Sequence, residues 1–187
     1  MTGGSAGPVK RSAEDWIQAG YAILAEEGIK ALKLDRLCTH LGVTKGSFYW
    51  HFTDMAGYRT AMVTAWAELR DRDRRHFGDL VDLLPRRRLS IMMSALLSAR
   101  QGRLERAMRE WARTDPAVAA SVRAADLRVL SAVRRAFTDA GFTAEESDLR
   151  ANATFAAGIG FLHLAPEADD ERLAAQQEGF LDLLMAR

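Results

Sequence analysis

The segment 44–52 gathers side chains that could contact a nucleic acid. A short helix predicted over 45–51 would turn Phe48 and Phe52, four residues apart, towards a core. So short a helix cannot bury every polar-tipped ring beside them, and some aromatic surface must face solvent or a partner. Exposed rings next to a lysine and a serine suit contact with thymine methyl groups, sugars and phosphates. The side chains with this chemistry are Lys45, Ser47, Tyr49, Trp50 and His51.

Three predicted helices would position these side chains. They cover residues 13–27, 34–41 and 45–51. A helix-turn-helix needs a helix across the DNA backbone, a tight turn such as Gly42 permits, and a short second helix that enters the major groove. The same pattern also fits an ordinary three-helix bundle, in which Tyr49 and His51 would pack back against neighbouring helices. The exposed face, Trp50 above all, favours the DNA-binding alternative.

The rest of the chain is also predicted to be helical, because no stretch alternates apolar and polar residues as a strand does. The later helices are predicted over about 54–82, 89–99, 104–113, 116–140, 144–164 and 170–185. Capping boxes, or a cap followed by proline, are predicted at Ser12–Asp15, Asp115–Pro116 and Thr143–Glu146. The expected fold class is therefore all-α, with about nine helices, the first three forming an N-terminal helix-turn-helix domain.

Composition limits the class of protein but does not by itself predict DNA binding. The chain has a net charge of +1, and residues 1–57 hold six basic and six acidic residues, whereas DNA-binding surfaces are usually positive. The single cysteine, Cys38, cannot form an internal disulfide, and the four histidines are scattered. No apolar run approaches the roughly 20 residues of a membrane span, and the first residues lack signal-peptide features. We therefore expect a cytoplasmic protein that is not an enzyme and holds no metal or cofactor.

One segment resembles the signature of the TetR family of transcriptional regulators: Leu41-Gly42-Val43-Thr44-Lys45-Gly46-Ser47-Phe48-Tyr49-Trp50-His51-Phe52. The strong resemblance covers about residues 12–58, and residues 108–116 are similar to segments of one branch of the family. It implies a flexible arm at 1–11, a helix-turn-helix DNA-binding domain at 12–54, and a C-terminal helical ligand-binding and dimerisation domain at 55–187. It also implies a repressor that binds a palindromic operator in double-stranded DNA as a homodimer and is released by a small molecule.

The resemblance carries the family's DNA contacts onto matching positions of this chain. They are Thr44, Lys45, Gly46, Ser47, Tyr49, Trp50 and His51, with Lys33 and Arg36 near the preceding helix. Two positions depart from the family's pattern. Lys33 stands where a serine or threonine usually caps the helix, and Met55 stands where a lysine commonly meets a phosphate, which should weaken sequence-independent affinity. Lys10 and Arg11 in the arm could compensate as further DNA contacts.

The resemblance also implies an effector pocket among the fourth to eighth helices. Methionine and aromatic side chains at helical spacing often form an ordinary core instead, but their number here favours a deformable cavity and hence an apolar or aromatic ligand. The candidate lining is Met62, Trp66, Met93, Leu96, Leu97, Met108, Trp111, Phe155 and Phe161. The basic run 86–88 is expected to be a solvated helix start.

Small side chains along the predicted helix 144–164 would let another helix approach closely, and the last helix carries a matching apolar stripe. Two such helices per subunit form the usual dimer interface of the family, and a two-fold dimer suits a palindromic operator. The candidate interface is Ala153, Ala156, Gly160, Leu173, Gln177, Phe180, Leu181 and Leu184. The alternative to a repressor is a helical adaptor that binds a protein partner through its second domain.

Overall fold

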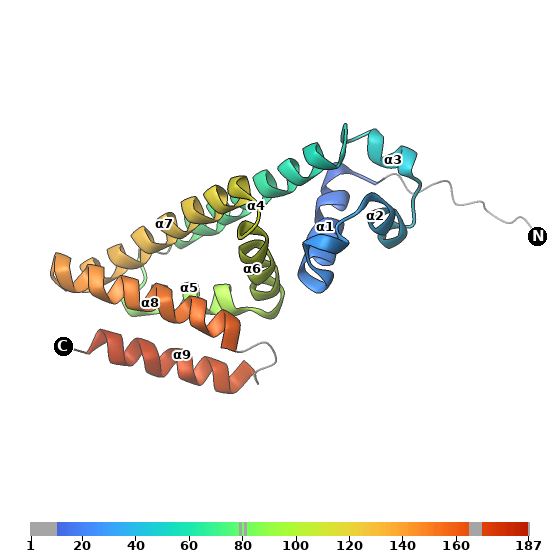
Figure 1. Ribbon diagram of the computed structural model, residues 1–187. Helices are drawn as coiled ribbons and strands as arrows, with labels where there is room; N and C mark the ends of the chain where they lie inside the picture. The colour runs from blue at the N-terminus through green and yellow to red at the C-terminus, as the bar shows by residue number, and fades with distance from the viewer. Residues whose placement is uncertain (1–10, 79, 81, 165–169, 187) are drawn as a thin grey trace, which may run out of the picture. The chain divides into compact units, whose positions relative to one another are not determined.

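The computed structural model describes residues 11–78, 80, 82–164 and 170–186. The chain forms two compact units, the first ending at Ala65 and the second beginning at Trp66. The division lies within one helix, α4 (Met55–Gly78), which therefore contributes to both cores (Figure 1). The domain boundary that the sequence predicts, after residue 54, lies at the N-terminal end of this helix. None of the described helices is long and apolar enough to cross a membrane.

The first unit is built from short helices around the start of α4. They are α1 (Ala13–Glu27), a single 3-10 turn (Ile29–Ala31), α2 (Leu34–Leu41) and α3 (Lys45–Tyr49). Gly42 ends α2 in the left-handed conformation with φ of 67°, which favours glycine and lets the chain turn sharply into α3. The three predicted helices are confirmed, although α3 ends earlier than expected and the 3-10 turn was not predicted.

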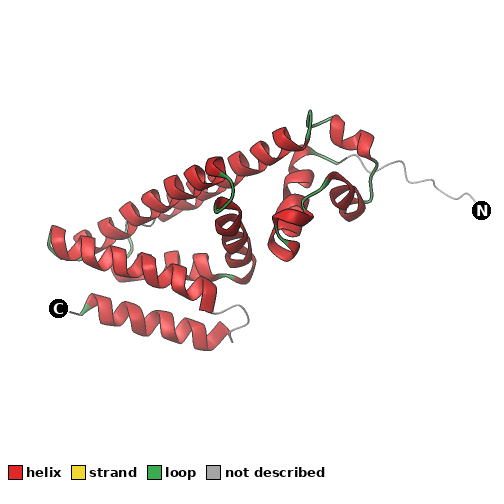
Figure 2. Cartoon of the chain, viewed as in Figure 1, coloured by secondary structure: helices red, strands yellow, loops and turns green. Residues whose placement is uncertain are grey.

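The second unit contains the end of α4 and five further helices. They are α5 (Pro85–Leu97), α6 (Ala99–Ala112), α7 (Pro116–Asp139), α8 (Ala144–Leu164) and α9 (Asp170–Met185). In Figure 1, α7 and α8 run side by side in opposite directions, and α9 lies along α8. Figure 2 shows helices and loops but no strand among the described residues, which confirms the all-α prediction.

The predicted helix starts are formed by the expected caps. The Ser12 hydroxyl accepts a hydrogen bond from the Asp15 N–H at 3.2 Å, and the Asp15 carboxylate accepts one from the Ser12 N–H at 2.8 Å. Thr143 and Glu146 exchange the same pair of bonds. Asp115 accepts from two N–H groups at the start of α7, so each cap satisfies backbone donors that the helix itself leaves unpaired.

Two helices begin earlier than the sequence predicts. Helix α5 starts at Pro85 rather than near residue 89, because the first helical position does not need the N–H that proline lacks. Helix α6 starts at Ala99 rather than near residue 104, so Gly102 lies inside a helix where a glycine usually weakens one.

The inward stripe of α9 completes the core of the second unit. Leu181 is fully buried, and Leu173 and Gln177 are almost as buried, all within a single chain. Phe180 and Leu184 pack on the same core. The sequence assigned these five residues to a dimer interface, but the structure places them against their own subunit, because a lone amphipathic helix buries its apolar face on the nearest apolar surface.

The basic run at the start of α5 also differs from expectation. Arg86 donates to Glu178 on α9 at 2.7 Å and also pairs with Asp182. Arg88 is only 9% exposed and lies 2.7 Å from Asp139 on α7. Hydrogen bonds from Ser90 and Arg86 hold the pKa of Glu178 below its usual value, so this carboxylate is charged at neutral pH. The run is therefore not a solvated helix start but ties α5 to its neighbours.

Candidate nucleic-acid interface and internal cavity

One buried ring holds the short helix α3 in place. The Phe48 side chain has no exposed surface. Its ring centroid lies 5.3 Å from that of Trp16 on α1, 5.3 Å from that of Phe52, and 5.6 Å from that of Tyr58 on α4. These are edge-on and tilted contacts of the kind that aromatic rings prefer. They fix which face of α3 points outwards.

The outward face of α3 carries the exposed aromatic surface that the sequence predicts. Trp50 is 87% exposed and Tyr49 is 60% exposed. The ring edge of Tyr49 rests on Phe48 at 5.5 Å, which limits where the ring can move. The neighbouring Thr44, Lys45 and Gly46 are exposed and Ser47 is half-buried. A tryptophan this exposed gains nothing from folding, so it is available to a partner.

His51 has a different role from the rings beside it. Its Nε2 atom lies 2.8 Å from the backbone oxygen of Arg11, just before α1. Arg11 in turn donates from Nη2 to the carbonyl of Leu41 at 3.2 Å, which satisfies one of the unpaired oxygens at the end of α2. Both predicted DNA contacts therefore hold the N-terminal segment against the first unit. The other predicted contact of the arm, Lys10, lies outside the described residues.

Two predicted cationic contacts already have acidic partners. The Lys45 Nζ atom lies 2.6 Å from Asp35 Oδ1, and both side chains are exposed. The hydrogen bond and the charge of Asp35 raise the pKa of Lys45. Arg36 binds Glu27 through two nitrogens, with Nη2 at 2.7 Å, and this hydrogen bonding lowers the pKa of Glu27. The face is thus close to electrically neutral, as the composition of residues 1–57 indicates.

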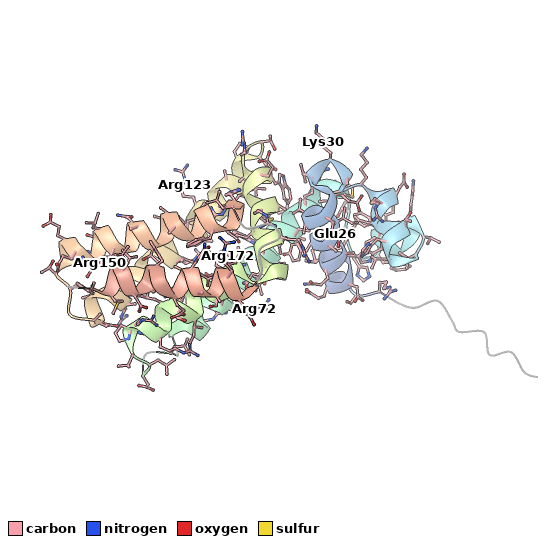
Figure 3. All side chains as sticks on the ribbon, turned by 90° about the horizontal axis from the view of Figure 1, so that it is seen from below. Glu26, Lys30, Arg72, Arg123, Arg150 and Arg172 are labelled. Carbon is pink, nitrogen blue, oxygen red and sulfur yellow. The ribbon has the colours of Figure 1, made fainter. Side chains whose placement is uncertain are left out.

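Two further lysines of the first unit are exposed. Lys33 is exposed at the start of α2 and makes no side-chain cap, so its departure from the family pattern leaves this helix start uncapped. Lys30 points away from the helices in Figure 3 and is exposed. It was not predicted as a contact.

The second unit contains a cavity of about 80 Å³ among α4 to α8. A single water molecule needs a cavity of roughly 10–15 Å³, so a cavity of this volume can hold a small ligand. Three predicted residues line it, namely Met93, Leu96 and Phe155. Apolar lining that was not predicted includes Leu89, Met92, Val129, Val133 and Ile159.

The other predicted pocket residues lie elsewhere. Met62 belongs to the first unit, where it is buried against Gly20. Trp66, Met108 and Trp111 are core residues with at most 3% exposure. Phe161 packs edge-on against Phe180 of α9 at 6.2 Å. Nothing is described of the Leu97 side chain. Apart from Leu97, these residues therefore belong to the ordinary core that the sequence left open as an alternative. The helical spacing of apolar residues alone could not separate core residues from cavity residues.

A buried cluster of charged side chains forms part of the cavity wall and was not predicted. Glu105 on α6 is 3% exposed. Arg109 donates to Glu105 at 2.9 Å and, through both terminal nitrogens, to Asp126 on α7. Burial opposes the charge of Arg109, but the hydrogen bond and charge of Asp126 and the charge of Glu105 outweigh it and raise the pKa of the guanidinium. A Glu–Arg pair four residues apart usually marks a solvated helix face, so the spacing of these two residues does not indicate their burial.

Neither unit offers a metal site or an activated thiol within the described residues. No cluster of histidine, cysteine, aspartate and glutamate side chains there could hold a metal ion. Cys38 is buried on the inner face of α2, and burial, with a smaller contribution from Asp35, raises the pKa of its thiol. A thiol with a raised pKa is a poor nucleophile at neutral pH.

Part of the chain matches the sequence model of a known protein family. Residues 17–58, which include most of α1, all of α2 and α3, and the rings of Phe48, Phe52 and Tyr58, match the sequence model described as "Bacterial regulatory proteins, tetR family". Over these residues the chain is similar to the TetR family. No curated protein sequence matches the chain.

Solved structures of regulators share the fold over nearly the whole chain. A transcriptional regulator from Rhodococcus sp. Rha1 is 21% identical, with a TM-score of 0.75 over 94% of each chain. FadR from Bacillus subtilis in complex with stearoyl-CoA is 15% identical, with a TM-score of 0.70 over 94% of this chain and 98% of that one. A TetR-like regulator from Rhodococcus sp. RHA1 is 16% identical, with a TM-score of 0.69 over 90% and 92%. At such identities the likeness shows the TetR fold.

Proposed function

We propose that this chain is a sequence-specific transcriptional repressor of the TetR type that binds a palindromic operator as a homodimer in the cytoplasm and is released by a small molecule. The observation that carries the proposal is the exposed Trp50 and Tyr49 face of α3, fixed in direction by the buried ring of Phe48. This face lies within the segment that matches the family.

The proposed DNA contacts divide into two groups. Thr44, Lys45, Gly46, Ser47, Tyr49 and Trp50 would meet bases, sugars and phosphates, with Lys33 and Arg36 meeting phosphates from α2. Gly46 would let the DNA backbone approach closely, since the nearest atom to a side chain added there is the Thr44 hydroxyl at 3.7 Å. His51 and Arg11 would act by holding the arm and α2 in position. The first group would contact the DNA directly, and the second would hold α2 and the N-terminal segment in the position that these contacts require.

Replacement of Trp50 by alanine tests the proposed interface. Because the ring is 87% exposed, the melting temperature should hardly change. Affinity for a duplex enriched from a random pool by the wild-type chain should fall by about 1–3 kcal/mol, or roughly fivefold to 150-fold. Fluorescence anisotropy with the labelled duplex measures the loss. Leu127→Ala, at a residue of α7 that is 61% exposed, is the control and should bind normally. Unchanged affinity of the Trp50 variant would remove the ring from the interface.

Replacement of Asp35 by asparagine tests whether this carboxylate restrains Lys45. The change frees the lysine, which lies 2.6 Å away, and removes a negative charge that would face phosphates. We expect tighter binding and a salt dependence steeper by about one phosphate contact. Titrations at several salt concentrations measure both. Glu110→Gln removes a carboxylate of the same charge, paired with Arg113, from the second unit and should leave the slope unchanged. If both variants change the affinity and the salt slope alike, the change comes from net charge and not from the release of Lys45.

The proposed dimer surface is the outward side of α8 and α9. Because the inward stripe of α9 is used within one subunit, we assign the interface to exposed residues instead. Leu149, Leu164 and Leu183 are 69%, 83% and 71% exposed. Gly160 and Gly179 have no atom within 4 Å of an added side chain, so a second helix could approach both. Of the predicted set, Ala153, Ala156 and Gly160 fit this surface.

A charge at Leu183 should separate the subunits. Leu183→Glu would bury a carboxylate in the proposed four-helix interface, where an unpaired charge is strongly unfavourable. Sedimentation at micromolar concentration should give twice the chain's 20.7 kDa for the wild type and a single chain for the variant. Leu84→Glu, at a position that is 78% exposed and outside α8 and α9, is the control and should remain dimeric. A variant with the wild-type mass would contradict the assignment.

The proposed effector site is the cavity of the second unit. Helix α4 supplies Arg70 to its wall and also supplies Tyr58 to the core around Phe48. A ligand that shifts α4 could therefore act on the segment that positions α3. Such a ligand must bind the released state more tightly, by about 1.4 kcal/mol for each tenfold loss of DNA affinity.

A further inference from the structure

The cavity has a polar end and an apolar end. Along α7 its lining runs from Ala125 to Val133, about 12 Å of helix at 1.5 Å per residue. Asp126 belongs to the buried charge cluster, whereas Val133 packs in the apolar core with Leu89 and Met93. A ligand that fills the cavity therefore needs an apolar body with hydrogen-bonding capacity at one end.

The charges of the polar end are already balanced. Arg109 is held by Asp126 at 2.6 Å and by Glu105 at 2.9 Å. The Arg70 Nη1 atom lies 3.3 Å from Asp73, and its Nε atom lies 3.5 Å from Glu105 Oε2. Of these groups, two guanidinium groups (Arg70 and Arg109) and two carboxylates (Glu105 and Asp126) line the cavity, so the charges of its wall cancel. A further buried charge of either sign would lack a counter-ion of its own, which makes a charged ligand head unfavourable.

The polar end of the cavity still has atoms that could form hydrogen bonds, although its charges are already paired. The side chain of Glu105 is 4% exposed, and its Oε2 atom accepts no hydrogen bond within the part of the chain that the structure describes. The buried Nη2 atom of Arg70 donates none there either. These two atoms belong to one ion pair that forms part of the cavity wall. Unsatisfied buried polar atoms are costly, so a ligand group that satisfies both gains affinity.

A hydroxyl group fits both atoms, because it accepts one hydrogen bond and donates another. An ether oxygen could accept from Arg70 but could not donate to Glu105. A carboxylate could accept but adds a negative charge, and an ammonium group could donate but adds a positive one. The chemistry of the wall therefore separates neutral alcohols from acids and amines that have the same apolar body.

We propose that the effector is a neutral amphipathic alcohol or phenol whose hydroxyl binds between Arg70 and Glu105. Its apolar body lies against Met93, Leu96 and Phe155. This inference rests on the proposed effector role of the cavity and adds the chemical class of the ligand.

Binding of 1-octanol, octanoate and octylamine to the full chain at neutral pH tests the head group. The three probes share an apolar chain and differ in charge. Calorimetry should show 1-octanol binding at least tenfold more tightly than either ion. Equal or tighter binding of octanoate or octylamine would overturn the inference, and so would the absence of binding by all three. Methyl heptyl ether, which only accepts, should bind more weakly than 1-octanol; equal affinity would overturn the two-sided role of the hydroxyl.

Arg70→Met tests the residue itself, since methionine keeps an apolar stem without donors. The affinity for 1-octanol should fall about tenfold and the preference over the ether should disappear. Arg72→Met is the matched control, because Arg72 lies on the same helix with its side chain exposed (Figure 3), and it should bind 1-octanol normally. If the Arg70 variant fails to fold, the comparison of ether with alcohol on the wild-type chain still decides.

Failure of this inference can be told apart from failure of the proposed function. Specific DNA binding that is released by an anionic or cationic compound, and not by 1-octanol, would overturn the ligand class and leave the repressor standing. Binding of 1-octanol with the expected order, in a chain that selects no DNA sequence, would support the ligand class and overturn the repressor.

Discussion

The burial of the Phe48 ring is the contact on which the proposed DNA-binding face depends. A helix of five residues is not stable alone in water, because its nucleation cost exceeds what so few hydrogen bonds return. Helix α3 therefore exists because Phe48 inserts between Trp16 on α1 and Tyr58 on α4. The same contact directs the side chains of Trp50 and Tyr49 outwards. Loss of the ring would remove both the helix and the direction of its exposed face.

Helix α4 is fixed to α1 by buried hydroxyl groups as well as by apolar contacts. Tyr58 donates to the Trp16 carbonyl and Tyr21 donates to the Met62 carbonyl, both at 2.7 Å. Burial strongly raises the pKa of Tyr58, which remains a neutral donor. A side chain at Gly20 would overlap the Tyr58 hydroxyl, so the two helices meet closely there. We infer that a shift of α4 would carry α1 and the Phe48 cluster with it.

The sequence predicted the all-α fold, the bounds of α9 and the exposed rings, because caps, turns and apolar period are local signals. It could not separate core from cavity among equally spaced apolar residues, which is why Met93 lines the cavity and Met62 does not. It also missed contacts between distant segments. Pairing of Arg86 with α9 brings together residues far apart in the chain, and the Glu105 cluster resembles a solvated helix face in sequence. Both depend on tertiary packing that no local pattern records.

Selection from a random pool of DNA duplexes by the purified full-length chain tests the central claim most directly. The account predicts enrichment of one palindromic sequence whose half-site centres lie about 34–36 Å apart or further, as a two-fold dimer with two exposed α3 faces requires. Enriched pools should also lose binding to the chain when an effector fills the cavity. Binding that is sensitive to salt but indifferent to sequence, with no palindrome enriched after repeated rounds, would contradict it.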